Sequence, residues 1–107
     1  VAKFDGAIAL DPNYKEALYQ KGITQMALGN YEDAKALFDQ ALVVDPNYKQ
    51  AYLGKGLALH ADGKLVEAQQ EYDKALEIDP GYSYAKISRM HALLAMNKPR
   101  EAFGMLI

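Results

Sequence analysis

Asp45-Pro46-Asn47-Tyr48-Lys49 lies near the middle of the chain, and the same five residues occur earlier as Asp11-Pro12-Asn13-Tyr14-Lys15. A near copy, Asp79-Pro80-Gly81-Tyr82, follows further along. The three stretches start at residues 11, 45 and 79, so the sequence repeats with a period of 34 residues. A period of this length is typical of proteins that stack one small structural unit on the next.

Proline marks the end of one helix in each period, because the residue before proline avoids helical backbone geometry. Glycine-containing turns at Gly29-Asn30 and at 62–64 predict the other breaks, and no stretch alternates with a period of two residues. At the helix starts, Asn13 with Glu16 and Asn47 with Gln50 each predict a capping box. We therefore expect no strands and seven helices, over 1–10, 14–28, 31–44, 48–61, 65–78, 82–96 and from Pro99 onward, with the first and last incomplete.

Small residues predict where the helices of one unit approach most closely. Gly22 and Gly56 lie in the first helix of a unit, and Ala34, Ala68 and Ala102 lie near the start of the second. We expect each glycine to face an alanine, while Phe38 or Tyr72, followed by Ala41 or Ala75, fills the gap to the next unit. Solvent is expected around the cationic heads of Lys21, Lys55 and Arg89 and around acidic side chains such as Glu32, Asp33, Glu67 and Glu71.

These residues resemble the tetratricopeptide repeat (TPR) family, with Gly in the first helix, Ala, an aromatic residue and Ala in the second, and a closing Pro. The third unit departs from the pattern, with Lys86 and Met90 at the aromatic and glycine positions. The resemblance implies an all-α fold, a right-handed superhelical solenoid of stacked antiparallel helix pairs. It also implies one domain, 1–107, divided into 1–14, 15–48, 49–82 and 83–107.

Composition and charge exclude several functional classes. The chain has 107 residues, with 12 basic and 14 acidic side chains, so it lacks the basic surface that nucleic acid requires. Half of the residues are hydrophobic, yet no apolar run is long enough to cross a membrane. The absence of cysteine fits a reducing compartment, so we expect a cytoplasmic protein. Because the sequence starts at Val1, we interpret it as a piece of a longer protein.

Catalytic and metal-binding residues are scarce. The histidines are His60 and His91, which can face one groove from neighbouring units and would then allow a two-histidine metal site, although we expect hydrogen bonding instead. Asp45 recurs in every period with Asp11 and Asp79, as expected for a structural residue rather than a catalytic one. We therefore predict no enzyme activity, no metal and no cofactor.

The resemblance implies that the first helices of the units line a concave groove that binds another protein or a peptide. By helical spacing the predicted lining is Glu16, Tyr19, Gln20, Ile23, Met26, Gln50, Leu53, Leu57, His60, Tyr84, Ile87, His91 and Leu94. The clamp with which some family members bind acidic peptide ends is absent, since its positions hold Tyr19, Ile23, Gly54, Tyr84 and Ser88. The alternative is self-association through terminal apolar residues, Phe4, Ile8, Phe103 and Leu106.

Overall fold

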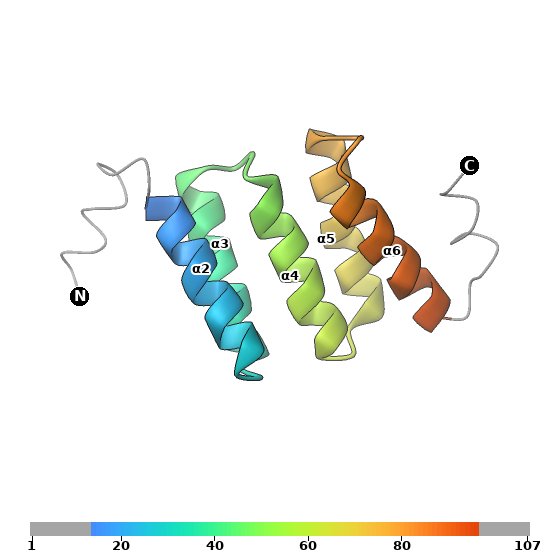
Figure 1. Cartoon of the computed structure of the whole chain (residues 1–107), viewed down its shortest axis with the longest axis horizontal. Helices are drawn as coiled ribbons and strands as arrows, with labels where there is room; N and C mark the ends of the chain where they lie inside the picture. Colours follow the sequence, from blue (N-terminus) through green and yellow to red (C-terminus); the bar gives the residue numbers. More distant parts are fainter. Residues whose placement is uncertain (1–13, 97–107) are drawn as a thin grey trace.

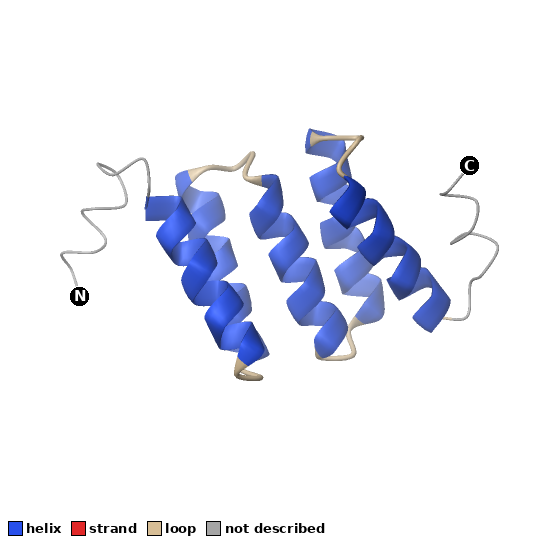
Figure 2. Cartoon of the chain, in the orientation of Figure 1, coloured by secondary structure: helices blue, strands red, loops and turns tan. Residues whose placement is uncertain are grey.

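A computed structural model describes residues 14–96 of the chain, and this part consists of five helices without a strand (Figure 2). They are α2 (Tyr14–Ala27), α3 (Tyr31–Val44), α4 (Lys49–Ala61), α5 (Leu65–Ile78) and α6 (Ser83–Ala95). Their bounds agree with the predicted helices to within one residue at each end. The helices predicted for 1–10 and from Pro99 onward lie outside the described residues.

The helices form two layers, with α2, α4 and α6 in front and α3 and α5 behind (Figure 1). Each helix packs against the next one in the chain, and α4 also contacts both α2 and α6. The predicted all-α stack of antiparallel helix pairs is therefore confirmed. Within residues 14–96, no helix has both the length and the apolar character needed to span a bilayer.

Glycine ends the first helix of each described pair. Gly29 and Gly63 have φ angles of 83° and 82°, in the left-handed region that favours glycine. The next residue then donates a backbone hydrogen bond into the last helical turn, from Asn30 N to the Gln25 oxygen at 2.9 Å and from Lys64 N to the Leu59 oxygen at 2.8 Å. These bonds satisfy carbonyl groups that the helix end leaves free, as the sequence predicts for the two turns.

The predicted capping box at Asn47 and Gln50 is wrong. Helix α4 starts at Lys49 with Tyr48 as its N-cap, and no side chain caps it. Instead, the Asp45 carboxylate accepts a hydrogen bond from the Asn47 backbone N–H at 3.0 Å, and Asp79 does the same for Gly81 at 3.1 Å. The aspartate before proline thus holds the turn, because its short side chain can bond the backbone two residues on.

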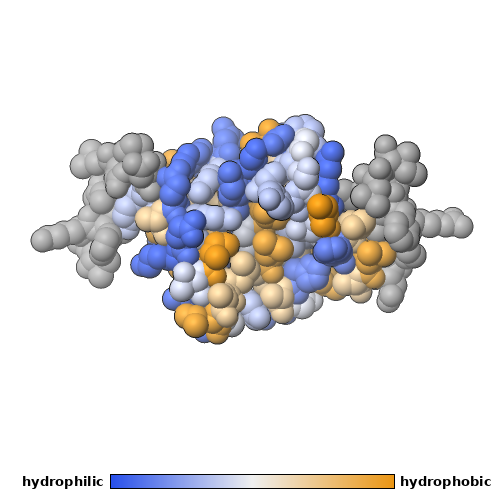
Figure 3. All heavy atoms as spheres, viewed as in Figure 1, coloured by the Kyte–Doolittle hydropathy of each residue, from blue (hydrophilic) through white to orange (hydrophobic). Residues whose placement is uncertain are grey.

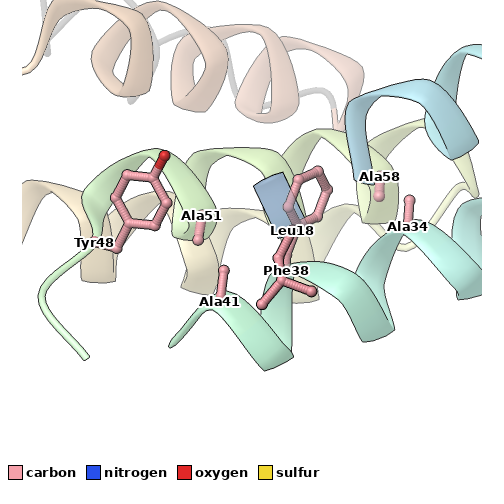
Figure 4. Close-up of a cluster of buried hydrophobic side chains, with 7 residues drawn as sticks. All are labelled: Leu18, Ala34, Phe38, Ala41, Tyr48, Ala51 and Ala58. Atoms are coloured by element: carbon pink, nitrogen blue, oxygen red, sulfur yellow. The ribbon is translucent and has the colours of Figure 1, made fainter. Parts of the chain in front are cut away.

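Two aromatic residues, Phe38 and Tyr72, form the centre of the core, and both are fully buried. Phe38 lies in a cluster with small residues of α3 and α4 such as Ala34 and Ala58 (Figure 4). A Cβ atom at Gly22 would lie 2.6 Å from the Phe38 ring, and one at Gly56 would lie 2.3 Å from the Tyr72 ring. The atoms nearest to each of these glycines therefore belong to an aromatic ring, which needs more room than the methyl group of the predicted alanine.

Phe38 also packs against the following unit, as predicted, since a Cβ atom at Gly54 would lie 2.7 Å from its ring. The sequence prediction attached no packing role to Gly54. Phe38 thus lies beneath the contact between α2 and α4, with a glycine on each side. We call this contact, made by α2, α3 and α4, the first junction, and the contact made by α4, α5 and α6 the second junction.

Ion pairs connect neighbouring units where the sequence predicts solvent. Lys55 Nζ lies 2.7 Å from Asp39 Oδ1 and 3.1 Å from Glu71 Oε1, and the Lys55 side chain is only 13% exposed. Arg89 Nε lies 2.6 Å from Asp73 Oδ1. The expectations of a hydrated Lys55 head and a solvated Glu71 are wrong, because the long cationic side chain meets carboxylates of α3 and α5 before it reaches water.

Candidate ligand-binding groove

All thirteen residues of the predicted groove lie in α2, α4 and α6, the layer that faces the viewer in Figure 3. On this face hydrophobic residues gather over the lower half, and hydrophilic residues cover most of the upper half (Figure 3). Tyr84, Ile87 and Leu94 of α6 are the most exposed large apolar side chains of the set, at 70%, 45% and 38%. Glu16, Gln20 and His91 are also exposed, and Ile23, Met26, Gln50, Leu57 and His60 are half-buried.

Two predicted groove residues belong largely to the core. Leu53 is 7% exposed and packs in the buried cluster that contains Tyr72. The Tyr19 ring centre lies 5.7 Å from that of Phe38 and 5.7 Å from that of Tyr48, and burial raises the pKa of Tyr19. Both side chains contribute to core packing, so a substitution at either site would disturb that packing.

A pocket of about 260 Å³ opens between α4 and α6. Its lining is Leu57, His60, Ala61, Tyr72, Ser88 and His91. The structure thus brings His60 and His91 together, as the sequence predicts, and adds Tyr72 and Ser88, which the sequence prediction missed. A position-by-position comparison of successive repeats would have revealed these two residues, because both are more polar than their counterparts one period earlier.

Lysine, aspartate and tyrosine form the same arrangement twice along the stack. Lys15 Nζ lies 2.6 Å from Asp45 Oδ2 and 5.0 Å from the centre of the Tyr48 ring. Lys49 repeats this with Asp79 at 2.6 Å and Tyr82 at 4.8 Å. The hydrogen bonds from Lys15 and from the Asn47 N–H lower the pKa of Asp45. Repetition in consecutive units supports the structural role predicted for the aspartates.

A second pocket, of about 280 Å³, lies at the turns that join the helices of each pair. It is lined by the Gly29-Asn30 turn, Tyr31, Glu32, Asp33 and Asp62. Lys64 Nζ lies 3.3 Å from Glu32 and 3.6 Å from Asp62, so a cation already pairs with this acidic surface. Across residues 14–96, no group of three or more His, Asp or Glu side chains is placed to hold a metal ion.

Comparison with known proteins agrees with this geometry. The sequence model of the family described as "Tetratricopeptide repeat" matches residues 19–83, more than half of the chain. A comparison with curated proteins finds no significant match. Among solved structures, the type III secretion translocator chaperone SycD of Yersinia enterocolitica is 26% identical, with a TM-score of 0.83 over 88% of this chain and 70% of that one.

Two further solved structures contain peptides. SycD in complex with a peptide of the translocator YopD is 27% identical to this chain, with a TM-score of 0.79 over 85% of this chain and 70% of that one. The second TPR of Spaghetti (RPAP3), bound to an HSP90 peptide, is 20% identical, with a TM-score of 0.83 over 92% and 91% of the two chains. The period, the helix pairs and the family match agree, and the chain therefore belongs to the tetratricopeptide repeat family.

Proposed function

We propose that this chain is a protein-interaction module that binds a peptide or a segment of a partner protein in the groove formed by α2, α4 and α6. The observation that carries the proposal is the row of exposed apolar side chains Tyr84, Ile87 and Leu94 on α6. They continue the half-buried lining of α2 and α4 on the same layer. The SycD complex with a YopD peptide supports this reading, because that protein shares the fold and is 27% identical.

Apolar burial would supply most of the binding free energy, at about 25 cal/mol per Å² of buried apolar surface. The groove carries no cluster of cations, since Lys15 and Lys49 at its edge are paired with Asp45 and Asp79. Charge would therefore contribute little, and affinity should depend only weakly on salt. The repeats that we propose as building blocks, 15–48 and 49–82, would each contribute one helix to the groove, followed by α6.

The test uses peptides selected from a displayed random library against the whole chain, and calorimetric titration of the selected peptides. Ile87→Ser combined with Leu94→Ser should weaken binding by tenfold or more, because each truncated anchor costs about 1 kcal/mol or more. Both residues are exposed, so the helical content should not change. This pair is a cleaner test than Leu53→Ser, which would also open the core around Tyr72.

Val43→Ser combined with Val66→Ser is the matched control. These valines are 79% and 61% exposed and lie on α3 and α5, in the other layer. The control should bind the selected peptides as wild type does. The groove proposal fails if the control loses binding while Ile87→Ser with Leu94→Ser retains it, or if affinity collapses between low and moderate salt.

Self-association through the terminal helices remains the alternative function. The residues on which it rests, Phe4, Ile8, Phe103 and Leu106, lie outside the described residues. Light scattering of the purified chain separates the two proposals. A concentration-dependent rise in mass that persists in the Ile87→Ser, Leu94→Ser variant, together with no peptide selection, would favour association over groove binding.

A further inference from the structure

The Tyr72 hydroxyl of α5 is a buried polar group behind the layer that forms the groove. Its side chain is fully buried, and its oxygen makes no hydrogen bond with any residue from 14 to 96. Burial raises the pKa of Tyr72 to about 12, so the O–H keeps its proton at neutral pH and remains a donor. Buried hydroxyls are nearly always paired, and an unpaired one is costly. Tyr72 lines the pocket between α4 and α6, where a ligand could supply the missing acceptor.

The other hydrogen-bonding residues of the pocket also occupy positions that hold less polar residues at the first junction. One period earlier, Tyr72 corresponds to Phe38, His60 to Met26, Ser88 to Gly54 and His91 to Leu57. Each of these four positions gains a hydrogen-bonding group at the second junction. The remaining two lining residues, Leu57 and Ala61, correspond to Ile23 and Ala27 and stay apolar.

Packing alone does not require these polar groups. At the first junction, Ile23 and Met26 pack against the apolar cluster around Phe38, and the helices meet in the same way. The second junction therefore carries hydrogen-bonding side chains that are not needed for the fold to form. A set of four on one pocket, with a buried donor among them, indicates a ligand and not a structural need.

The chemistry of the pocket favours a carboxylate. Tyrosine and serine each donate through O–H, and an imidazole has at least one N–H to donate in either protonation state. Among residues 14–96, no acidic side chain lines the pocket, so none of these residues repels an anion there. A carboxylate offers two oxygens and about four acceptor positions, enough for all the donors. Leu57 and Ala61 provide an apolar wall for the carbon chain that carries it.

We propose that this pocket binds a carboxylate attached to a short apolar chain, as on the acidic side chain or C-terminus of a peptide in the groove. The inference rests on the proposed peptide-binding function and specifies a chemical group of the peptide that the pocket recognises. Tyr72, His60, Ser88 and His91 are the donors, and Leu57 with Ala61 contacts the apolar part. Recognition here uses hydrogen bonds from residues that need not be charged, in contrast to the cationic clamp that is missing from this chain.

The test uses two small probes of equal shape, isovalerate and its neutral amide isovaleramide. Histidine side-chain NMR signals of the whole chain are followed while each probe is added. Isovalerate should shift the His60 and His91 signals in a saturable way, with a Kd of about 1–10 mM. Isovaleramide should bind at least tenfold more weakly, because its NH₂ group replaces one acceptor oxygen by a donor.

Tyr72→Phe is the decisive variant, because phenylalanine already fills the corresponding position at the first junction as Phe38. It should fold normally and bind isovalerate at least tenfold more weakly than wild type. Tyr31→Phe is the matched control, since it removes a tyrosine hydroxyl from the pocket at the turns and not from the groove, and it should bind the probe as wild type does. His60→Met and His91→Leu, which restore first-junction residues, should each weaken binding.

Equal binding of the two probes, or unchanged isovalerate binding by Tyr72→Phe, overturns the inference. Loss of isovalerate binding on adding EDTA also overturns it, because the pocket would then act through a metal ion held by His60 and His91. These results are independent of the groove proposal. If selected peptides still depend on Ile87 and Leu94 while isovalerate is not distinguished from its amide, the groove proposal stands and the carboxylate site is lost.

Discussion

The first junction, where α2 meets α4 above Phe38, and the second junction, where α4 meets α6 above Tyr72, have the same helix arrangement but different surfaces. In both, a fully buried aromatic ring of the second layer fills the space beside a glycine of the front layer. At the first junction apolar residues pack around Phe38, whereas the second junction opens into a pocket with four hydrogen-bonding side chains. The buried ring beside a glycine is thus common to both junctions, and the residues around the ring differ between them.

The largest expected effect concerns Lys55, which pairs with Asp39 at the first junction and with Glu71 at the second. Burial alone would lower the pKa of Lys55, but hydrogen bonds to Asp39 and Glu71 outweigh it and the pKa is raised. Lys55→Met should reduce the free energy of unfolding by about 3 kcal/mol, because it leaves the buried Glu71 carboxylate with only Lys74 as a partner. Urea unfolding measures the loss.

The double variant Lys55→Met, Glu71→Leu is the control for that experiment, since it removes both buried charges and should recover most of the lost stability. Arg89→Met at the second junction should cost less, about 1 kcal/mol, because the Asp73 side chain is 43% exposed to water, whereas Glu71 is buried. If Lys55→Met and Arg89→Met have equal, small effects, the Lys55 pair is not buried in solution and the two junctions are held by side-chain packing alone.

The next effect concerns the glycines beside the two rings. Gly54→Ala should destabilise the chain by about 1–3 kcal/mol, because the new Cβ would lie 2.7 Å from the Phe38 ring. The corresponding residue at the second junction is already Ser88, and Ser88→Gly should change stability by about 0.5 kcal/mol, the difference in helix propensity. Denaturant midpoints of both variants provide the comparison. A harmless Gly54→Ala would show that the first junction is not tightly packed.

Exchange of the two ring residues should produce opposite changes in stability. Tyr72→Phe should raise the free energy of unfolding by about 1 kcal/mol, since it removes a buried hydroxyl that lacks a partner. Phe38→Tyr should lower it by a similar amount or more, because it places a hydroxyl among apolar residues. For a domain of this size, 1 kcal/mol corresponds to a change in Tm of about 4–8 °C.

The outcome of the Tyr72 exchange also separates stability from binding. A more stable Tyr72→Phe variant that binds isovalerate poorly would mean that the chain gives up stability to keep the pocket polar. A less stable Tyr72→Phe variant would instead indicate that the hydroxyl makes a structural hydrogen bond. In that case the contrast between the two junctions would reflect packing and not ligand recognition.

The smallest effect is the pH dependence that comes from Asp45 and Asp79. Hydrogen bonds from Lys15 and from the Asn47 N–H lower the pKa of Asp45 below its ordinary value of 3.8, and Lys49 with the Gly81 N–H does the same for Asp79. A carboxyl whose pKa is lower in the folded state stabilises the fold above its unfolded pKa. This contribution should therefore be complete above about pH 5 and should disappear as the pH falls below 3.8.

Thermal unfolding between pH 2 and pH 6 checks this dependence. Asp45→Asn combined with Asp79→Asn should flatten the acid side of the Tm profile and leave the neutral side slightly lower. Glu32→Gln, which removes an exposed carboxylate from the turn region, is the control and should keep the wild-type profile. An unchanged acid side in the double variant would mean that other carboxylates dominate acid unfolding.

The sequence by itself determined the features that depend on residues close together in the chain. The 34-residue period, the helix ends before proline, the left-handed turns at Gly29 and Gly63 and the all-α class all follow from local backbone preferences. The capping box at Asn47 was a local prediction that failed, because Asp45 two residues earlier bonds the same backbone region. The remaining local predictions were reliable because the same residue pattern recurs in successive units.

Only the tertiary structure decided which side chains meet across units. It placed Gly54 against Phe38, buried Leu53 and Glu71, and brought Tyr72 and Ser88 into one pocket with the histidines. These contacts join residues from different helices. Helical spacing predicts on which face of its helix a residue lies, but not how deeply its side chain is buried or which residue it contacts. The physical reason is that packing and ion pairing depend on the distances between helices. The period of 34 residues implies only an average distance, and the side chains at each junction determine the actual one.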